Sequence, residues 1–289
     1  MKIHTYRPST ATLPETGIIA PFPFSGTPEN TGPRLQMVAD TVGASVLAFN
    51  RRGTGSRAFI DLGAKRALKP ARVHMTHAQT ADSLLAAGVK DDYPTLVGWG
   101  DSGSGELIMG MQLTTRLFGR LLLRDCFNHA APQGPVEGIR NFIRYTTHGE
   151  LEKVADPQAP QVPAVPQGRG GSIARQLVEI YNYSALMRSD HTLEAAHMLA
   201  ADHPELPMRI VGFAHSFTGT HEQTTAFHTE LLAERVQVAN LIHGIDDEAS
   251  VGDVYTSIAN GYHSDLLRPD HAAHHLEQTL ALHPLPERH

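Results

Sequence analysis

A serine lies in a glycine-rich turn at which the sequence predicts that a strand passes into a helix. Residues 96–107 read L-V-G-W-G-D-S-G-S-G-E-L, and Gly100-Asp101-Ser102-Gly103-Ser104 fits the pattern small-x-Ser-x-small. Small residues flank such a serine because a sharp strand-to-helix turn leaves no room for larger side chains. Backbone N–H groups and the dipole at the helix N-terminus then stabilise a developing oxyanion. The pattern indicates that Ser102 is a nucleophile, and the competing interpretation is a helix N-cap.

Two histidines are candidates for the base that accepts the proton of this serine. An imidazole with an unperturbed pKa of about 6.5 suits general base work near neutral pH. His243 directly follows a predicted strand, and His263 comes shortly before the last predicted helix. The chain has 18 histidines, so the residue type alone does not choose between them.

A metal or a redox group is not expected. His271, His274 and His275 stand at positions i, i+3 and i+4 of the last predicted helix, but no acidic motif accompanies them. We interpret them as a stripe on the helix surface rather than as metal ligands. The single cysteine, Cys126, permits neither an intrachain disulfide nor a cysteine metal site. The sequence therefore predicts neither a metal nor a cofactor.

Short apolar strands and longer amphipathic helices alternate along most of the chain. Strands are predicted at residues 17–20, 45–49, 95–99, 120–123, 208–213 and 236–242, and helices at 33–42, 73–87, 106–117, 222–234 and about 269–282. Nearly all-apolar strands separated by helices predict a parallel sheet covered on both faces. The alternation stops after about residue 129, where helical segments surround a proline-rich stretch, and it resumes near residue 206.

The order of these motifs resembles the α/β-hydrolase superfamily. Arg52-Gly53-Thr54-Gly55-Ser56 follows a strand, the Ser102 turn follows the next strand, and Gly261-Tyr262-His263 precedes the last helix. The resemblance implies an α/β-hydrolase fold, with a mostly parallel central sheet, helices on both faces and an inserted helical cap. Residues 1–129 and 206–289 would form the core, and residues 130–205 the cap with its proline-rich connector.

The same resemblance implies a triad, with alternatives at each position. Ser102 would be the nucleophile, although matching Gly98-Trp99-Gly100-Asp101 to a Gly-Trp-Ser-Asp variant of the family would put Gly100 at the apex. The position after strand 208–213 holds His215 instead of the usual acid. Asp125 is the first choice for the acid, and Asp246 and Asp247 are alternatives. His263 matches the family's base better than His243 does.

The resemblance also implies an oxyanion hole and a substrate pocket. One N–H group would come from Gly103 and the other from the loop at residues 20–28, where the prolines have no N–H to donate and Phe24 is the choice. The substrate would lie between the carboxyl edge of the sheet and the cap. Phe22, Trp99 and Asp101 are the predicted pocket residues.

Composition limits the partners. Lys+Arg 24 against Asp+Glu 30 gives a net charge of −6, so no excess of cations exists to bind nucleic acid. No run of about 18 apolar residues predicts a membrane span, and the first residues lack the apolar core of a signal peptide. We expect a cytoplasmic protein whose partner is a small-molecule substrate; whether it forms a homodimer stays open.

Three functions fit these observations. The first is a serine hydrolase, esterase-like, acting on a small to medium-sized apolar carbonyl compound. The second keeps the cleft but performs non-hydrolytic natural-product tailoring, such as rearrangement, elimination or carbon–carbon coupling. The third is a non-catalytic protein that binds a small molecule in the same cleft. The superfamily contains all three kinds, so fold by itself does not choose between them.

Overall fold

A seven-stranded sheet forms the centre of the computed structural model, which describes residues 1–22, 28–50, 73–101, 104–126, 192–215, 254–262 and 268–282, with residues 226, 229 and 230. The strand order is β1-β3-β2-β4-β5-β6-β7. The strands are β1 (Ile3–Tyr6), β2 (Thr16–Pro21), β3 (Ser45–Phe49), β4 (Thr95–Asp101), β5 (Arg120–Arg124), β6 (Met208–His215) and β7 (Val254–Tyr262). β1 pairs antiparallel with β3, and all other pairs are parallel. The mostly parallel sheet expected from the sequence is confirmed.

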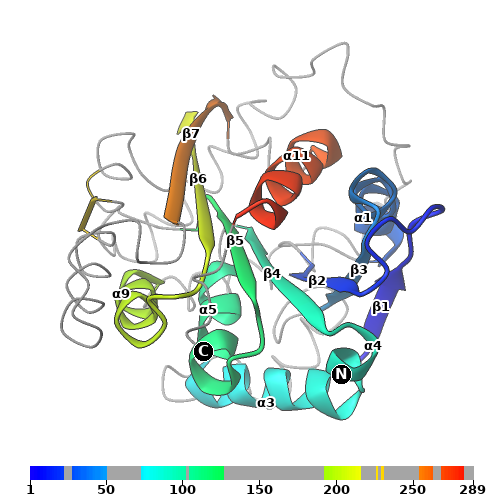
Figure 1. Ribbon diagram of the computed structural model, residues 1–289, viewed down its shortest axis with the longest axis horizontal. Helices are drawn as coiled ribbons and strands as arrows, with labels where there is room; N and C mark the ends of the chain where they lie inside the picture. Colours follow the sequence, from blue (N-terminus) through cyan, green and yellow to red (C-terminus); the bar gives the residue numbers. More distant parts are fainter. Residues whose placement is uncertain are drawn as a thin grey trace, which may run out of the picture.

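Helices cover both faces of this sheet (Figure 1). α1 (Pro28–Val42) and α11 (Pro269–Leu280) contact each other on one face, while α5 (Gly105–Thr115) on the other face contacts both α3 (Val73–Ala86) and α9 (Thr192–Asp202). The short α4 (Val89–Asp92) follows α3. Among the described residues, no helix is long and apolar enough to cross a membrane.

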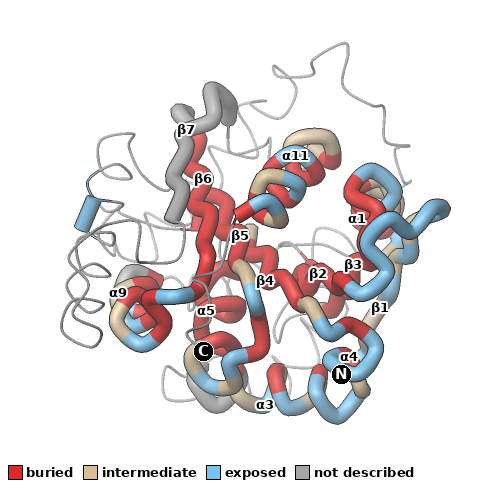
Figure 2. The backbone as a smooth tube through the Cα atoms, viewed as in Figure 1, coloured by how far each residue is buried: buried red, intermediate tan, exposed pale blue. Residues whose placement is uncertain are grey.

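The buried strands divide their side chains between two cores because successive side chains of a strand point to opposite faces. Ile19 and Leu96 belong to the core beneath α3, α5 and α9, whereas Ile18 and Val97 belong to the core beneath α1 and α11. All four are at most 1% exposed. Figure 2 shows the central strands as a continuous buried layer. This two-sided burial explains why the strands are almost uniformly apolar in sequence.

The observed elements match most of the predicted ones, but two strands, β1 and β7, were not predicted. β3 has the predicted bounds, and β4 extends two residues beyond its prediction, to Asp101. β7 was missed, because residues 254–262 were treated as part of a connection. Its sequence V-Y-T-S-I-A-N-G-Y contains Asn-Gly, a pair typical of turns. The helix predicted at 222–234 and the strand predicted at 236–242 lie largely or wholly outside the described residues.

The core begins again earlier than the predicted boundary at residue 206. α9 falls within the segment assigned to the cap, yet it packs against α5. Ala196, Leu199 and Ala200 are fully buried in the same core as the α5 side chains. The described part of the chain therefore places α9 in the helical layer of the core, and residues 130–191 lie outside it. A cap between residue 130 and α9 stays a prediction.

Candidate functional site

The structure describes the strand and the helix on either side of the turn predicted around Ser102. β4 ends at Asp101 and α5 begins at Gly105, with Ser104 as the residue before the helix. Gly100 lies inside β4, where it pairs with Leu123 of β5, and Asp101 pairs with Arg124. Gly100 is therefore a strand residue and not the apex of the turn. Ser102 and Gly103, which connect the two elements, lie outside the described residues.

Two glycines allow the helix to approach the strand closely. A Cβ atom on Gly100 would lie 2.8 Å from Cα and 3.1 Å from N of Gly105, both of which are backbone atoms. A Cβ atom on Gly105 would lie 2.5 Å from Cβ and 2.6 Å from Sγ of Cys126. Neither position has room for a side chain, which is the physical reason for the small residues on both sides of the turn.

A Gly100→Ala substitution is expected to lower the free energy of unfolding by about 1–3 kcal/mol, since the backbone of α5 must move to admit the methyl group. The control is Gly119→Ala, where the nearest atom to the added Cβ would be the carbonyl oxygen of Leu96 at 3.9 Å. That change should stay within about 0.5 kcal/mol. Urea unfolding followed by circular dichroism measures both. Equal losses in the two variants would contradict the close approach at Gly100.

The second serine of the turn has a structural role. Ser104 is 3% exposed, and its hydroxyl is bonded on both sides to the backbone of Asp101. Its Oγ accepts a hydrogen bond from Asp101 N at 2.7 Å and donates one to Asp101 O at 2.8 Å. These two bonds fix the first residue before the helix to the last residue of the strand. They also occupy the Ser104 hydroxyl, so it is not available as a nucleophile in this geometry.

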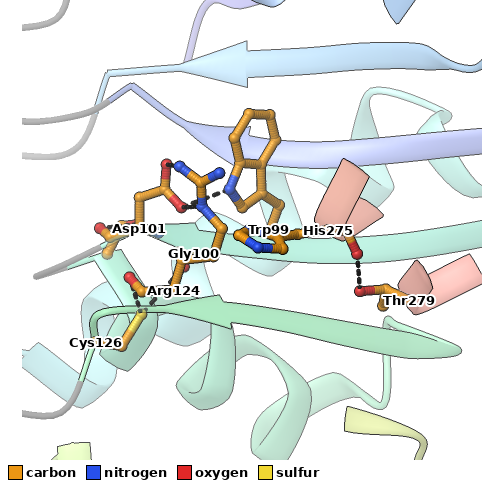
Figure 3. A network of polar contacts seen from close by, with 8 residues as sticks. Trp99, Gly100, Asp101, Arg124, Cys126, His275 and Thr279 are labelled. Carbon is orange, nitrogen blue, oxygen red and sulfur yellow. Dashed lines mark hydrogen bonds and ion pairs between the residues drawn. The ribbon is translucent and has the colours of Figure 1, made fainter. Parts of the chain in front are cut away.

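A buried ion pair joins the carboxyl ends of β4 and β5 (Figure 3). Arg124 donates from Nε to Oδ1 of Asp101 at 2.8 Å and from Nη2 to Oδ2 at 3.2 Å. Trp99 Nε1 also donates to Asp101 Oδ1, at 2.6 Å. The Arg124 guanidinium lies 5.6 Å from the centre of the Trp99 ring, within the range of a cation–π contact. The Arg124 side chain is 0% exposed and that of Asp101 is 16% exposed. The network holds Asp101, the neighbour of Ser102, from two sides.

Asp125, the first choice for the acid, directly follows β5. It is 6% exposed and has a φ of +51°, a left-handed conformation that is uncommon for residues other than glycine. Its N–H donates to Val211 O on β6 at 2.7 Å, which fixes the backbone between two parallel strands. Backbone strain of this kind is often found at functional sites. The structure therefore puts the Asp125 backbone at the carboxyl edge of the sheet, two strands from β7.

Cys126 is a packing residue beneath the turn. Its Sγ donates to Gly100 O at 3.1 Å, and the side chain fills the space left by Gly105. Burial raises the pKa of the Cys126 thiol well above its ordinary value, and the charges of Asp101 and Asp125 add to this effect. The protonated thiol is a weak nucleophile, so this group is not a competitor for the role of Ser102.

A pocket opens at the carboxyl ends of β2 and β4. These strands are neighbours, but the chain leaves β2 through α1 on one face and β4 through α5 on the other. Such a change of direction is where open α/β sheets bind ligands. The pocket is a partly open hollow, with about 430 Å³ of space between its walls when the open solvent is included. Its lining includes Pro21, Arg34, Leu35, Trp99, Asp101 and Arg268. Trp99 and Asp101 are among its lining residues, and their role toward a substrate stays a prediction.

Phe22 is a core residue. Its side chain is 1% exposed, and its ring lies edge-on to His4 at 5.8 Å between centroids. Its N–H donates to Phe49 O at 2.9 Å, which continues the pairing of β2 with β3. It is not among the described residues that line this pocket. Phe22 instead belongs to the same buried cluster as the lining residues Leu35 and Trp99.

The stripe of histidines on α11 is not wholly on the surface, contrary to the prediction. His275 is 7% exposed and faces the core side of the helix. Burial, followed by the positive charges of Arg124 and Arg209, lowers the pKa of His275 to about 3, so its imidazole is neutral near pH 7. The ring centres of His271 and His274 lie 6.5 and 5.8 Å from that of His275. No group of three metal ligands occurs among the described residues.

Several predicted site residues lie outside the described residues: Ser102, Gly103, Phe24, His243, His263, Asp246 and Asp247. The described ends of the neighbouring elements still bear on them. β7 ends at Tyr262, so the chain leaves the carboxyl edge of the sheet at the residue before His263. Arg34, Arg124 and Ser104 were missed as site residues. Only Arg124 could have been noticed in the sequence, because it is a charged residue at the end of an apolar strand.

Comparisons with known proteins identify the fold. No protein-family model and no curated protein sequence matches the chain. The structure resembles a lipase-esterase related protein from Clostridium acetobutylicum, with a TM-score of 0.60 and 11% identity over 96% of this chain and 99% of that one. It also resembles the RedJ thioesterase of the prodiginine pathway in Streptomyces coelicolor, with a TM-score of 0.54 and 15% identity over 94% and 93% of the chains. A third match is Est1E from Butyrivibrio proteoclasticus with bound ferulic acid, with a TM-score of 0.52 and 15% identity over 97% and 95%. The chain has the α/β-hydrolase fold.

Proposed function

We propose that this protein is a serine hydrolase, esterase-like, which cleaves a small to medium-sized apolar carbonyl substrate with Ser102 as nucleophile. The observation that carries the proposal is the turn between β4 and α5. The strand runs through Asp101, the helix begins at Gly105, and Ser104 is bonded to the Asp101 backbone. Since Ser104 is occupied by these bonds, Ser102 is the other hydroxyl that the sequence places between the strand and the N-terminus of the eleven-residue helix α5.

The path of the chain supports His263 as the base. Tyr262 ends β7, three strand positions from β4, or about 14 Å at the usual strand spacing. Arg268 lines the pocket beside Asp101. Residues 263–267 join these two points in the sequence, and five residues can span at most about 20 Å, which is sufficient for this distance. His263 is the first residue of this segment, directly after β7, whereas His243 comes before β7 in the chain.

Asp125 is the proposed acid because it directly follows β5. In the sheet, β5 lies between β4, which precedes Ser102, and β7, which precedes His263. Its carboxylate would accept a hydrogen bond from the imidazole of His263 and stabilise the imidazolium that forms. Asp246 and Asp247 are the alternatives to it. The N–H groups of Gly103 and Phe24 would complete the site as the oxyanion hole.

The reaction would proceed in two halves. Ser102 Oγ attacks the ester carbonyl carbon while His263 takes the hydroxyl proton, and the oxyanion hole holds the negative charge on the carbonyl oxygen. The tetrahedral intermediate expels the alcohol, which receives the proton from His263. Water then attacks the acyl-serine with the same base, so that an acid is released and the Ser102 hydroxyl is restored.

A fluorophosphonate probe tests this proposal directly. Such probes form a covalent bond with an activated serine and displace fluoride, so the intact mass should increase by one adduct per chain. Ser102→Ala should abolish the adduct. Ser83→Ala is the matched control, because the Ser83 hydroxyl bonds to Gln79 O within helix α3 and is not part of the turn. It should leave labelling unchanged.

Labelling that survives Ser102→Ala, or a folded wild-type protein that is never labelled, would contradict the hydrolase. In the second case, turnover that depends on His263 and not on Ser102 would favour non-hydrolytic tailoring. Ligand binding without turnover would favour the binding protein.

A further inference from the structure

Among the described residues, one cation of the pocket at β2 and β4 has no counter-charge. Arg34 projects from α1 into the pocket lining, and its side chain is partly buried. Its Nε is buried without a hydrogen-bond partner, and no ion pair to Arg34 occurs within the described residues. Burial lowers the pKa of Arg34 from its ordinary value. Keeping a guanidinium partly desolvated and unpaired costs free energy unless an anion binds to it.

The other charges at the pocket already have partners. Asp101 is paired with Arg124 at 2.8 Å. Arg268, at the N-terminus of α11, is paired with Asp270 at 2.7 Å. Each of these two ion pairs has no net charge. In the described part of the pocket, the positive charge of Arg34 is therefore the one that remains to be balanced. The charge arrangement therefore fits a ligand group that carries a single negative charge.

Apart from Thr31, the remaining described walls are apolar. Pro21, Leu35, Val38, Trp99, Pro269 and Ala272 supply most of the surface around the charged groups. Such walls suit a hydrocarbon or aromatic body attached to the anionic group. A carboxylate matches the planar fork of a guanidinium and carries one charge. A phosphate monoester carries about 1.5 to 2 charges at neutral pH and would require a second unpaired cation.

We propose that this pocket binds a carboxylate on an apolar body, with Arg34 as its counter-ion, and hence that the substrate of the site is an ester bearing a free carboxylate. The identification of the substrate as an ester rests on the proposed hydrolase. Asp101 lines the pocket and precedes Ser102 in the chain, so a ligand held here lies beside the strand-to-helix turn. Arg34 would then select the substrate by charge.

Trp99 provides the measurement, because it is the only tryptophan of the chain and lines the pocket. The probes are 3-phenylpropionate and its neutral amide, which share one apolar body. Titration of the wild-type protein should change Trp99 emission saturably, and the carboxylate should bind about 10 to 100 times more tightly than the amide. Arg34→Gln should remove this preference.

Two further variants keep the test specific. Arg7→Gln removes the same charge from an exposed arginine outside the pocket and should preserve the preference for the carboxylate. Arg34→Met keeps the apolar stem of the side chain and should behave as Arg34→Gln does, which guards against one poorly folded variant. Near-ultraviolet circular dichroism verifies the tertiary structure of each.

The proposal is overturned if the wild-type protein binds acid and amide equally, if Arg34→Gln and Arg34→Met keep the preference, or if Trp99 shows no saturable response up to about 10 mM acid, where even weak specific binding would be detected. The readout requires no reaction at Ser102. Failure here with normal fluorophosphonate labelling refutes the carboxylate site and leaves the hydrolase intact; the reverse result refutes the hydrolase, together with the ester substrate that depends on it, and leaves the carboxylate site intact.

Discussion

Replacing His263 by alanine is expected to lower kcat/KM for p-nitrophenyl butyrate by roughly 10³- to 10⁶-fold, because the base and nucleophile of such a site act as one unit. Ser102→Ala should cause a loss of similar size. The double variant should lose little more than either single variant, since removal of one partner already disables the other. Initial rates at several substrate concentrations, with circular dichroism to verify folding, provide the measurement.

His243→Ala is the matched control for this loss. His243 follows the strand predicted at 236–242, whereas β7 ends directly before His263. The control should retain activity within about threefold, as expected for a residue outside the reacting groups. The wild-type rate should also fall as acidic pH protonates the base, because a protonated imidazole accepts no proton. A large loss in His243→Ala with activity retained in His263→Ala would assign the base to His243.

Breaking the ion pair beneath the turn should cause the largest loss of stability. Asp101→Asn keeps the shape of the side chain but leaves the Arg124 guanidinium, 0% exposed, without the charge of its partner. We expect the free energy of unfolding to fall by about 3–5 kcal/mol, the usual cost of removing one member of a buried pair. Arg124→Met should cost less, because the Asp101 carboxylate is 16% exposed and retains the Trp99 N–H.

Asp270→Asn is the control for this prediction. It removes the carboxylate of a pair of similar length, Arg268–Asp270 at 2.7 Å, but these side chains are 18% and 35% exposed. The expected loss is below about 1 kcal/mol, since water solvates both charges. Urea unfolding of Asp101→Asn, Arg124→Met and the double variant gives a coupling energy, expected at about 1–3 kcal/mol. A loss in Asp101→Asn no larger than in Asp270→Asn would refute the role of the buried pair.

The local elements could be predicted well from the sequence because their signals are local. Residues 45–49 form a continuous apolar, β-branched run, and β3 has those bounds. The glycines around Ser102 indicated a tight passage from strand to helix, and the close approach of Gly100 to Gly105 supplies its physical cause. β7 was missed since its polar residues and Asn-Gly pair resemble a turn.

The candidate site required knowledge of the tertiary structure. Asp101 and Arg124 are 23 residues apart and meet only because β4 and β5 pair in a register that places them side by side. His275 shares its helix with the exposed His274, and packing of α11 decided that His275 is buried. Hydrophobic periodicity identifies an element and its apolar face, but it contains no information on which residues of other elements lie opposite.

The sequence by itself determined the fold class, most strands and helices, and the position of the turn that holds Ser102. The pocket was decided by tertiary structure alone. Its walls come from the ends of β2 and β4, from α1 and from the start of α11, segments that span residues 20 to 272 of the chain. Arg34, whose charge has no partner within the described part of the chain, is a similar case, since the sequence shows an arginine but not which charges surround it. Burial and pairing are properties of groups brought together by folding, whereas turns and periodicity are properties of neighbours along the chain.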